Sequence, residues 1–248
     1  MSLDPDDWDS HWRNQADVAR GNPASAFRHR LVLQRLLKVS PAKIIDIGSG
    51  QGDLLQTLSN YFDESALAGI ELSAAGVEET KEKLPNSVVH QQNLLDPSYE
   101  PFATDFDCLT CVEVLEHLDA PQVFLEVALE HLRNGGFAVV TVPSGPRTAF
   151  DISIGHRRHF KKTDLRRLLL DAGLVDVRVR RVGFPFFDLY RVLVFLRGRK
   201  LIQDVENQSL KDSHLARGLM SLFDFLLRLN PNFLPIGSQL VATGYNAR

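Results

Sequence analysis

Residues 43–54 (KIIDIGSGQGDL) constrain the fold of this chain more than any other stretch. The first residues are β-branched and apolar, which is typical of a strand that is covered on both faces of a sheet. Asp46 interrupts that run, and Gly48, Gly50 and Gly52 follow at a spacing of two residues. Glycine permits a positive φ and a close approach of ligand to backbone, and the start of a helix offers free N–H groups. The stretch therefore predicts a strand, a ligand-binding turn and a helix.

Strands and helices alternate along the rest of the chain. Further strand patterns occur at 66–71, 87–91, 106–111, 137–142, 175–182 and 239–245, and helical patterns at 24–38, 53–62, 74–84, 120–132 and 163–172. The residues 134–136 (NGG) are expected to end the helix over 120–132, and the strand at 239–245 to close an edge of the sheet. This order predicts an α/β fold with a doubly wound, Rossmann-like, mostly parallel sheet of seven strands, whose last strand is antiparallel.

The length of 248 residues suits one domain that carries an insertion. We expect a single domain over residues 1–248, with an N-terminal helical cap at 1–40 and a helical insertion at 183–237 that serves as a substrate lid or an interface. A helix at about 214–229 places six apolar residues on one face: Leu215, Leu219, Leu222, Phe223, Leu226 and Leu227. That face either packs against the core or forms a lid, a dimer surface or a membrane contact.

Polar residues follow the carboxyl ends of several expected strands, where ligands bind in sheets of this kind. A dinucleotide site is disfavoured, because the third glycine of GxGxxG is absent and Asp46 would repel a pyrophosphate. S-adenosylmethionine fits better, since its methionine end is cationic. Glu71, with Leu72 beside it, can accept both ribose hydroxyls, and Asn93 with Leu94 can contact the adenine.

Several motifs in order resemble the class I S-adenosylmethionine-dependent methyltransferases, especially the small-molecule group that includes the ubiquinone-biosynthesis O-methyltransferases. They are DIGSGQG at 46–52, the acid Glu71, NLLD at 93–96, EVLEHL at 113–118, the glycine pair 135–136 and the stretch 156–174. Asn93 departs from the family, where many members have Asp. The resemblance covers about residues 25–182 and does not include the 183–237 insertion.

The resemblance implies a set of cofactor-binding residues. Arg28, with Arg30 as its rival, is expected to pair with the methionine carboxylate, and Val112 and Glu113 are expected to border the cofactor. The full expected set is Arg28, Asp46, Gly48, Ser49, Gly50, Gly52, Glu71, Leu72, Asn93, Leu94, Val112 and Glu113.

The expected reaction is methyl transfer to a small molecule, at an oxygen atom. His117 and His156 are the expected catalytic residues, because a hydroxyl or phenol needs a general base and histidine suits that role. The alternatives are an N- or C-methyltransferase of the same fold and a non-catalytic S-adenosylmethionine-binding protein. In the ubiquinone group the pattern formed by Glu113, Glu116 and His117 implies a divalent metal site, but relatives without metal share it, so the metal stays undecided.

Charge and cysteine content narrow the partners. The net charge of −3 argues against nucleic acid, although residues 151–200 hold 13 Lys/Arg and 5 Asp/Glu and so carry +8. Cys108 and Cys111 are expected to be buried thiols, and no secretory or transmembrane segment is visible, so we expect a cytoplasmic protein. Peripheral membrane contact and a homodimer remain open, and the sequence does not identify the methyl acceptor.

Overall fold

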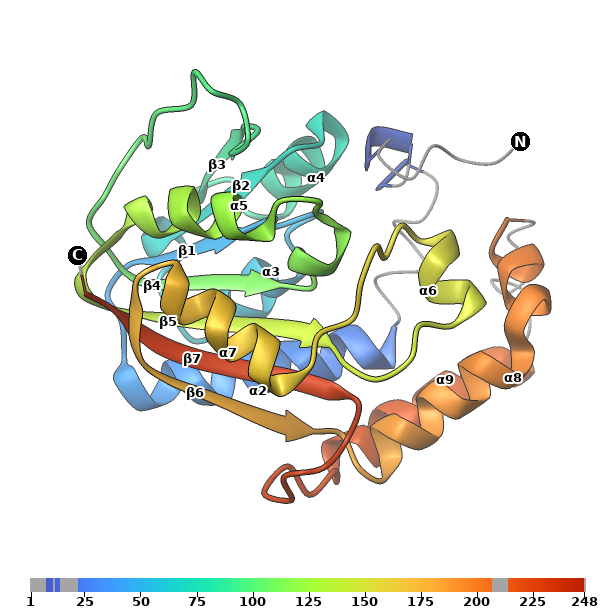
Figure 1. Ribbon diagram of the computed structural model, residues 1–248. Helices are drawn as coiled ribbons and strands as arrows, with labels where there is room; N and C mark the ends of the chain where they lie inside the picture. The colour runs from blue at the N-terminus through green and yellow to red at the C-terminus, as the bar shows by residue number, and fades with distance from the viewer. Residues whose placement is uncertain (1–7, 11, 14–21, 207–213, 248) are drawn as a thin grey trace.

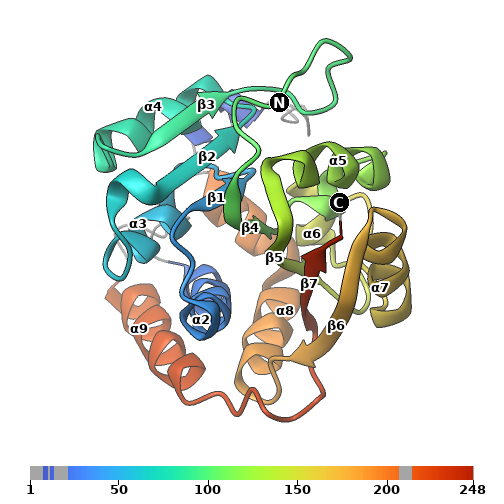
Figure 2. The same cartoon turned by 90° about the vertical axis from the view of Figure 1, so that its left-hand side faces the viewer.

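The computed structural model describes residues 8–10, 12–13, 22–206 and 214–247 of the chain. Within these residues seven strands form one sheet in the order β3-β2-β1-β4-β5-β7-β6 (Figures 1 and 2). The strands are β1 Ile44–Ile47, β2 Leu67–Glu71, β3 Val88–Gln91, β4 Phe106–Val112, β5 Leu132–Pro143, β6 Leu174–Val182 and β7 Gln239–Asn246. The strands β1 to β5 pair in parallel, and β7 is antiparallel to both β5 and β6. The predicted doubly wound α/β fold is therefore confirmed.

Helices cover both faces of the sheet. They are α2 Pro23–Val39, α3 Asp53–Ser59, α4 Ala74–Lys83, α5 Pro121–Ala128, α6 Ala149–Ser153, α7 Lys162–Asp171, α8 Phe186–Glu206 and α9 His214–Arg228, with the 3₁₀ turns η1 Glu64–Ala66, η2 Leu115–His117 and η3 Leu129–His131. One face packs against α5 and α7, and the other against α2, α3 and α4. In Figure 2, α8 and α9 flank α2 on that second face. None of the helices in the described residues has the length and hydrophobicity to span a membrane.

Both faces of β1 are buried, as its β-branched residues predict. Ile45 and Ile47 point into the core beneath α5 and α7, whereas Ile44 points into the core beneath α2 and α3. β1 lies between β2 and β4, and its register pairs Ile47 with Cys111 of β4. The chain leaves β1 toward one side of the sheet and enters β4 on the other, so the carboxyl ends of these two strands form the switch point where ligands bind.

The sequence predicted that the last strand closes an edge of the sheet, and this prediction is wrong. β7 lies between β5 and β6, which makes β6 the edge. The burial of the two strands explains this order: β7 is buried along most of its length, whereas five residues of β6 are exposed, including Arg178, Arg180 and Arg181. An apolar strand gains more from an interior position, and a basic strand protects an edge from pairing with other chains.

The prediction for the helix over 120–132 also needs correction. The helix predicted over 120–132 ends at Ala128, and Asn134, Gly135 and Gly136 lie inside β5 rather than at a helix end. Gly135, with φ +69°, lies where the pairing of β5 with β4 jumps from Leu132 to Phe137, so it provides a bulge.

The apolar face predicted for the helix at 214–229 is divided between the core and solvent. Phe223 and Leu227 of α9 are buried, but Leu219 and Leu222 are exposed. The side chain of Leu215 lies outside the described residues. The two cysteines of β4, Cys108 and Cys111, are buried and free, as expected.

Candidate functional site

A cavity of about 340 Å³ opens at the carboxyl ends of β1 and β4. The glycine turn after β1 forms its floor, and α2, α6, α8 and α9 contribute to its walls. The expected site residues that line it are Arg28, Asp46, Gly48, Ser49, Gly50, Val112, Glu113, His117 and His156. The glycine turn and the two candidate catalytic histidines therefore share one cavity.

The glycine turn is held against β2 by its backbone. The N–H groups of Gly48 and Ser49 both donate to the carbonyl of Ile70, at 2.8 and 3.1 Å. Gly48 and Gly50 have φ values of +73° and +56°, a region that other residues rarely adopt. A Cβ on Gly48 would lie 2.5 Å from Val114 Cγ2, and one on Gly50 would lie 2.6 Å from the ring of Trp12. The turn needs glycine at both positions for conformation and for space.

Asp46 places a carboxylate on the floor of the cavity. It is 2% exposed, and its Oδ1 accepts a hydrogen bond from Thr110 Oγ1 at 2.6 Å. Burial raises the pKa of Asp46 to about 7, the hydrogen bond from Thr110 opposes that rise, and the charge of Glu71 adds to it. A buried carboxylate that is this hard to ionise favours a cationic ligand beside it. Ser49 is also buried, and its hydroxyl has no hydrogen-bond partner among the described residues, so the floor offers a ligand both a charge and a hydroxyl.

Glu71 ends β2, and both oxygens of its carboxylate accept hydrogen bonds from backbone N–H groups. Oε2 accepts from the N–H of Gly50 at 2.8 Å, and Oε1 accepts from the N–H of Ser73 at 3.0 Å. Burial raises the pKa of Glu71, and hydrogen bonds from Ser73, Gly50 and the Trp12 side chain oppose that rise. An ionised carboxylate has about four lone-pair sites, so these two backbone hydrogen bonds leave room for further donors.

The adenine side of the expected site is separated from the cavity. Gly52, Glu71, Leu72, Asn93 and Leu94 do not line it. Leu94 is buried in the core, and Asn93 Oδ1 accepts from the N–H of Leu95 at 3.0 Å, which is an Asx turn. Trp8 and Trp12 line the cavity on this side.

Glu113 is held in a strained backbone conformation by several partners. Its φ is +57°, and its N–H donates to the carbonyl of Thr141. Its Oε1 accepts from Thr141 Oγ1 at 3.0 Å and from Gln239 Nε2 at 2.8 Å, and its Oε2 lies 3.6 Å from Arg28 Nη1. Arg30, the rival of Arg28, pairs with Asp224 of α9 at 3.1 Å and does not line the cavity. Of the two candidates, Arg28 is therefore the one that lines the cavity.

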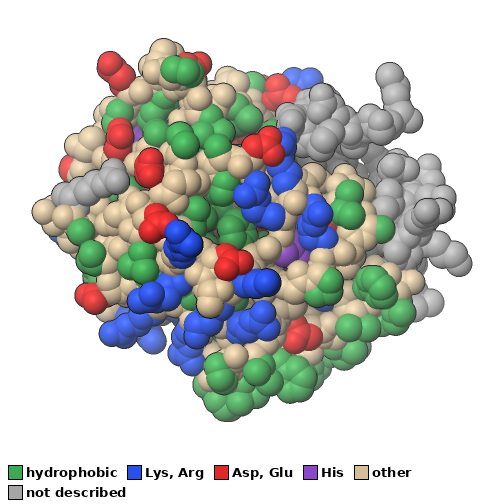
Figure 3. Space-filling model, viewed as in Figure 1, with side chains coloured by type: hydrophobic (Ala, Val, Ile, Leu, Met, Phe, Trp, Pro, Cys, Tyr) green, Lys and Arg blue, Asp and Glu red, His purple; other side chains and the backbone are tan. Residues whose placement is uncertain are grey.

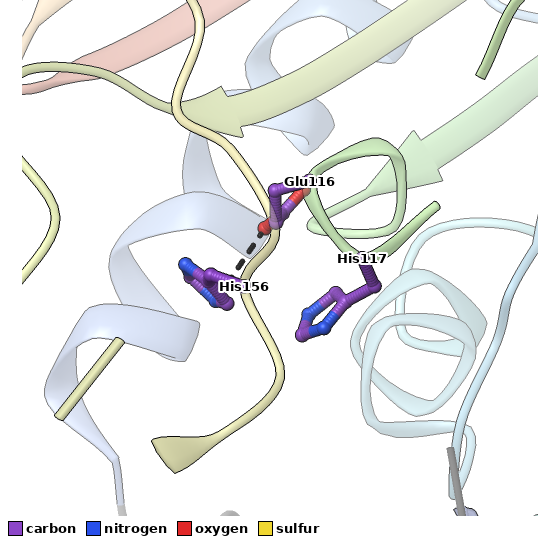
Figure 4. Close-up of side chains that lie close together, drawn as sticks. All are labelled: Glu116, His117 and His156. Atoms are coloured by element: carbon purple, nitrogen blue, oxygen red, sulfur yellow. Dashed lines mark ion pairs between the residues drawn. The ribbon is translucent and has the colours of Figure 1, made fainter. Parts of the chain in front are cut away.

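Glu116, His117 and His156 converge at the end of β4 (Figure 4). Glu116 and His117 belong to η2, and His156 comes from the segment after α6. That segment is fixed to η2, because the N–H groups of Arg157 and Arg158 donate to the carbonyl of Glu116. The rings of His117 and His156 meet edge to face with centroids 4.7 Å apart, and Trp8 meets His117 in the same way at 4.8 Å.

His156 connects two clusters of titratable groups. Its Nε2 lies 3.9 Å from Glu116 Oε1, and its Nδ1 lies 3.0 Å from His159 Nε2. Asp151 approaches both of these histidines, at 4.0 and 3.8 Å. Burial lowers the pKa of His156 to about 2, with further repulsion from His117 and His159, so His156 is neutral at physiological pH.

The geometry of these side chains fits a divalent cation. The ligand atoms of Glu116, His117 and His156 lie within 4.8 Å of one another, and so do those of Asp151, His156 and His159. Glu116 is completely buried, and neither of its carboxylate oxygens has a hydrogen-bond partner among the described residues. Burial and the charge of Glu113 raise its pKa well above the usual value. Glu113, which the sequence grouped with Glu116 and His117 without deciding on a metal, is in neither group.

Several residues that line the cavity have no role in the predictions from the sequence. Tyr190, Arg191 and Val194 come from α8 and Met220 from α9, within the 183–237 insertion. Arg191 is placed by an ion pair with Asp151 at 3.3 Å and a hydrogen bond to the carbonyl of Ser144 at 2.9 Å. An arginine on a helix is usually a solvated charge, so only the fold shows that Arg191 faces the site.

Comparison with known proteins identifies the family of this chain. A family model described as a methyltransferase domain matches residues 20–179. A Mycobacterium tuberculosis protein named as a probable S-adenosylmethionine-dependent methyltransferase is 28% identical over 163 residues, which cover 60% of this chain and 55% of that protein. The mitochondrial ubiquinone biosynthesis O-methyltransferase of Candida albicans is 31% identical over 108 residues, which cover 41% of this chain and 32% of that protein.

Solved structures agree on the fold. Phosphoethanolamine N-methyltransferase 2 of Haemonchus contortus, in complex with phosphomonomethylethanolamine and S-adenosylhomocysteine, superposes with a TM-score of 0.59 at 19% identity, covering 89% of this chain and 52% of that one. The matched part of the chain spans about half the length of the curated relatives that it matches. The insertion after residue 179 lies outside the family match.

Proposed function

Because the chain belongs to the methyltransferase-domain family, we propose that it transfers a methyl group from S-adenosylmethionine to an oxygen atom of a small molecule. The observation that carries this proposal is the cavity floor. There a glycine turn meets the buried carboxylate of Asp46 and the unpartnered hydroxyl of Ser49. Bound S-adenosylmethionine supplies an electrophilic methyl group on a sulfonium, and the remaining chemistry is done by residues of this chain.

The cofactor would be held by the residues of the floor and of β2. Asp46 would face the cationic methionine end, and Arg28, at the cavity wall, would face the carboxylate. Glu71 would accept hydrogen bonds from the ribose, with Leu72, Asn93 and Leu94 toward the adenine. None of these four residues lines the cavity, so the proposal for them rests on the family pattern alone.

The acceptor would bind between the histidines and the insertion. His117 lines the cavity and is the proposed general base, which accepts the proton that an acceptor hydroxyl loses. His156 has a pKa of about 2 and is a poor base near neutral pH, so its proposed role is to position the acceptor or a cation. Tyr190 and Arg191 offer a hydroxyl and a positive charge from α8, which would bind polar groups of the acceptor.

If the site binds a divalent cation, Glu116, His117 and His156 would hold it, and His117 would then serve as a ligand in place of its role as the general base. The cation would stabilise the negative charge on the acceptor oxygen as the proton leaves. The support for this assignment is the buried carboxylate of Glu116, whose oxygens have no hydrogen-bond donor among the described residues. The neutral His156 beside it supplies a lone pair, as a metal ligand must.

The test uses S-adenosylmethionine with a labelled methyl group and a panel of small hydroxylated acceptors. We expect label in a methyl ether or ester, identified by mass spectrometry. His117→Gln should lower kcat by about 10²- to 10⁴-fold, because it removes a general base. The control is His90→Gln, a histidine of β3 that stacks on Phe102 away from the cavity, and it should leave kcat unchanged.

Each part of the proposal has its own contrary result. A failure of calorimetry to detect binding of S-adenosylhomocysteine would overturn the cofactor assignment. Binding without transfer to any acceptor would indicate a non-catalytic S-adenosylmethionine-binding protein. Label on nitrogen or carbon, with a rate that does not depend on His117, would indicate the N- or C-methyltransferase alternative.

A further inference from the structure

Exposed apolar side chains gather on the insertion. Eleven of the 22 exposed large apolar side chains of the described residues lie between positions 184 and 236. They are Phe184, Leu189, Val192, Phe195, Leu196, Leu219, Leu222, Phe225, Leu229, Phe233 and Ile236. We name this set the apolar edge. Figure 3 shows hydrophobic side chains along the lower edge of the molecule, where Figure 1 places α8, α9 and the loop before β7.

Each of the two helices has one buried and one exposed apolar face. In α9, Phe223 and Leu227 are buried, whereas Leu222 and Phe225, and Leu229 just after the helix, are between 51% and 58% exposed. Residues three and four apart share a face of a helix, so these exposed residues form a continuous stripe. The exposed residues of α8 follow the same spacing. A stripe of this kind on a helix that also packs against a protein core is typical of an interaction surface.

Unpaired positive charges lie beside the apolar edge. A second cavity, of about 600 Å³, opens between the end of α2, the strand β6 and the loop that carries Phe233. Four of its lining residues are cations: Arg35, Lys38, Arg178 and Arg180. Within the described residues none of the four forms an ion pair, and Asp176 is the one acid in the lining.

The two features are physically joined. Arg180 Nη2 donates to the carbonyl of Phe233 at 3.1 Å, so a basic strand holds the tip of the apolar edge. Phe233 itself is 73% exposed. Burial and the charge of Arg180 lower the pKa of Arg35, so these cations repel one another and favour an anion between them. Nearby Lys and Arg side chains are visible beside the apolar side chains in Figure 3.

We propose that the apolar edge, together with the cations of this second cavity, docks on the surface of a phospholipid bilayer that contains anionic lipids. Apolar side chains enter the boundary between head groups and acyl chains, and nearby cations attract the anionic head groups. A soluble anion would account for the cavity but not for eleven exposed apolar side chains. A protein partner would account for the apolar side chains, but no feature of the described residues points to one.

Docking would place the catalytic cavity next to the bilayer. α8 carries Leu189, Val192 and Phe195 on its outer face, and Tyr190, Arg191 and Val194 of the same helix line the catalytic cavity. A lipophilic acceptor dissolved in the bilayer would reach this cavity along α8. The acceptor class rests on the proposed methyl transfer, whereas the docking itself does not.

The test is sedimentation of the full chain with vesicles of phosphatidylcholine, with and without phosphatidylglycerol. We expect stronger binding to the anionic vesicles and a decrease when salt is added. Leu222→Glu and Phe225→Glu should each lower the affinity for vesicles by about tenfold or more, because a charge replaces an apolar side chain that would enter the bilayer on docking. Arg178→Gln should lower it by about fivefold, on anionic vesicles only.

Matched controls lie on α5 and α4, outside the apolar edge and the second cavity. Val123→Glu on α5 changes a side chain that is 51% exposed, as Leu222 is, and Lys81→Gln on α4 removes one exposed cation. Both variants should sediment like the unsubstituted protein. Binding of S-adenosylhomocysteine, measured by calorimetry on each variant, shows that the fold and the cofactor site persist.

Three results would overturn the proposal. The first is no sedimentation with either kind of vesicle. The second is a loss of vesicle affinity in the Val123→Glu control that equals the loss in Leu222→Glu. The third is a protein that does not bind vesicles and forms a dimer, which Leu222→Glu dissociates in size-exclusion chromatography. Binding to vesicles by a protein that does not bind S-adenosylhomocysteine would support the docking and contradict the proposed methyl transfer. The two proposals can therefore fail separately.

Discussion

Asp46→Asn should make the protein more stable and its cofactor site weaker. Asp46 is 2% exposed, and its main stabilising contact is the hydrogen bond from Thr110. An asparagine keeps an oxygen that can accept this bond and fits the same space. The substitution removes a charge that the folded protein ionises only at a cost, and it also removes the charge that we propose faces the cationic methionine end.

The magnitude follows from the pKa of Asp46, which burial raises from 3.8 to about 7. Between these values the folded protein holds a proton that the unfolded chain has lost, so the free energy of unfolding decreases as pH rises through this range. A pKa difference of about three corresponds to about 4 kcal/mol. The Asp46→Asn variant lacks this decrease. Its stability relative to the unsubstituted protein should therefore grow from pH 4 to pH 7 by up to about 4 kcal/mol, and then stay constant.

The assay is urea unfolding of both proteins, without cofactor, at a series of pH values. Asp63→Asn is the control of opposite sign: hydrogen bonds from Ser65 lower the pKa of this exposed carboxyl, so its stabilising effect on the unsubstituted protein is complete above about pH 4 and is lost below it, and the variant should be the less stable of the two above that pH by a constant amount. Calorimetry with S-adenosylmethionine should show affinity increasing up to about pH 7 in the unsubstituted protein and independent of pH in Asp46→Asn. A stability difference between these two proteins that is the same at pH 4 and pH 8 would refute the reasoning.

Three further predictions test the rest of the site. Glu71→Gln should weaken binding of S-adenosylhomocysteine in calorimetry by about 1.5–3 kcal/mol, the range for hydrogen bonds to a charged group, and unchanged affinity would contradict the ribose assignment. Gly50→Ala should lower the melting temperature, because the new Cβ would lie 2.6 Å from Trp12 at a φ of +56°, whereas Gly218→Ala in α9 has open space and should raise stability by about 1 kcal/mol. A chelator should slow methyl transfer until Mg²⁺ or Mn²⁺ is restored, and Glu116→Gln should be slow with or without chelator; a rate that the chelator leaves unchanged would argue against the cation.

The parts of the fold that the sequence predicted are those set by local physics. The run of isoleucines in β1 and the glycines after it determine a strand and a turn without help from the rest of the chain. The position of β7 could not be read in this way. An apolar strand can sit at an edge or inside a sheet, and only its pairing with both β5 and β6 decides between them.

The residues of the site also divide into those that the local sequence predicts and those that only the fold brings together. Asp46, Gly48 and Gly50 are neighbours in sequence, so their convergence was predictable. The trio of Glu116, His117 and His156 was predicted only in part, because the sequence spacing suggested Glu113 on a helix with the other two. The positive φ of Glu113 and its bonds to Thr141 and Gln239 turn its side chain to other partners. No local pattern near Glu113 indicates that a residue of the last strand will bind it.

The insertion is tied to the cavity at both of its ends, so it could bind the acceptor, as we propose, without disturbing the cofactor site. Asp188 of α8 accepts hydrogen bonds from the N–H and the hydroxyl of Ser238, at 2.8 and 2.6 Å, just before the chain returns to the sheet. The next residue, Gln239, binds Glu113. Arg191 of α8 bonds to the carbonyl of Ser144 and pairs with Asp151. These anchors lie on the acceptor side of the cavity, whereas the glycine turn is held by β2. Changes in the middle of α8 or α9 would therefore alter what meets the histidines, or the surface on which the protein docks, and leave the glycine turn in place.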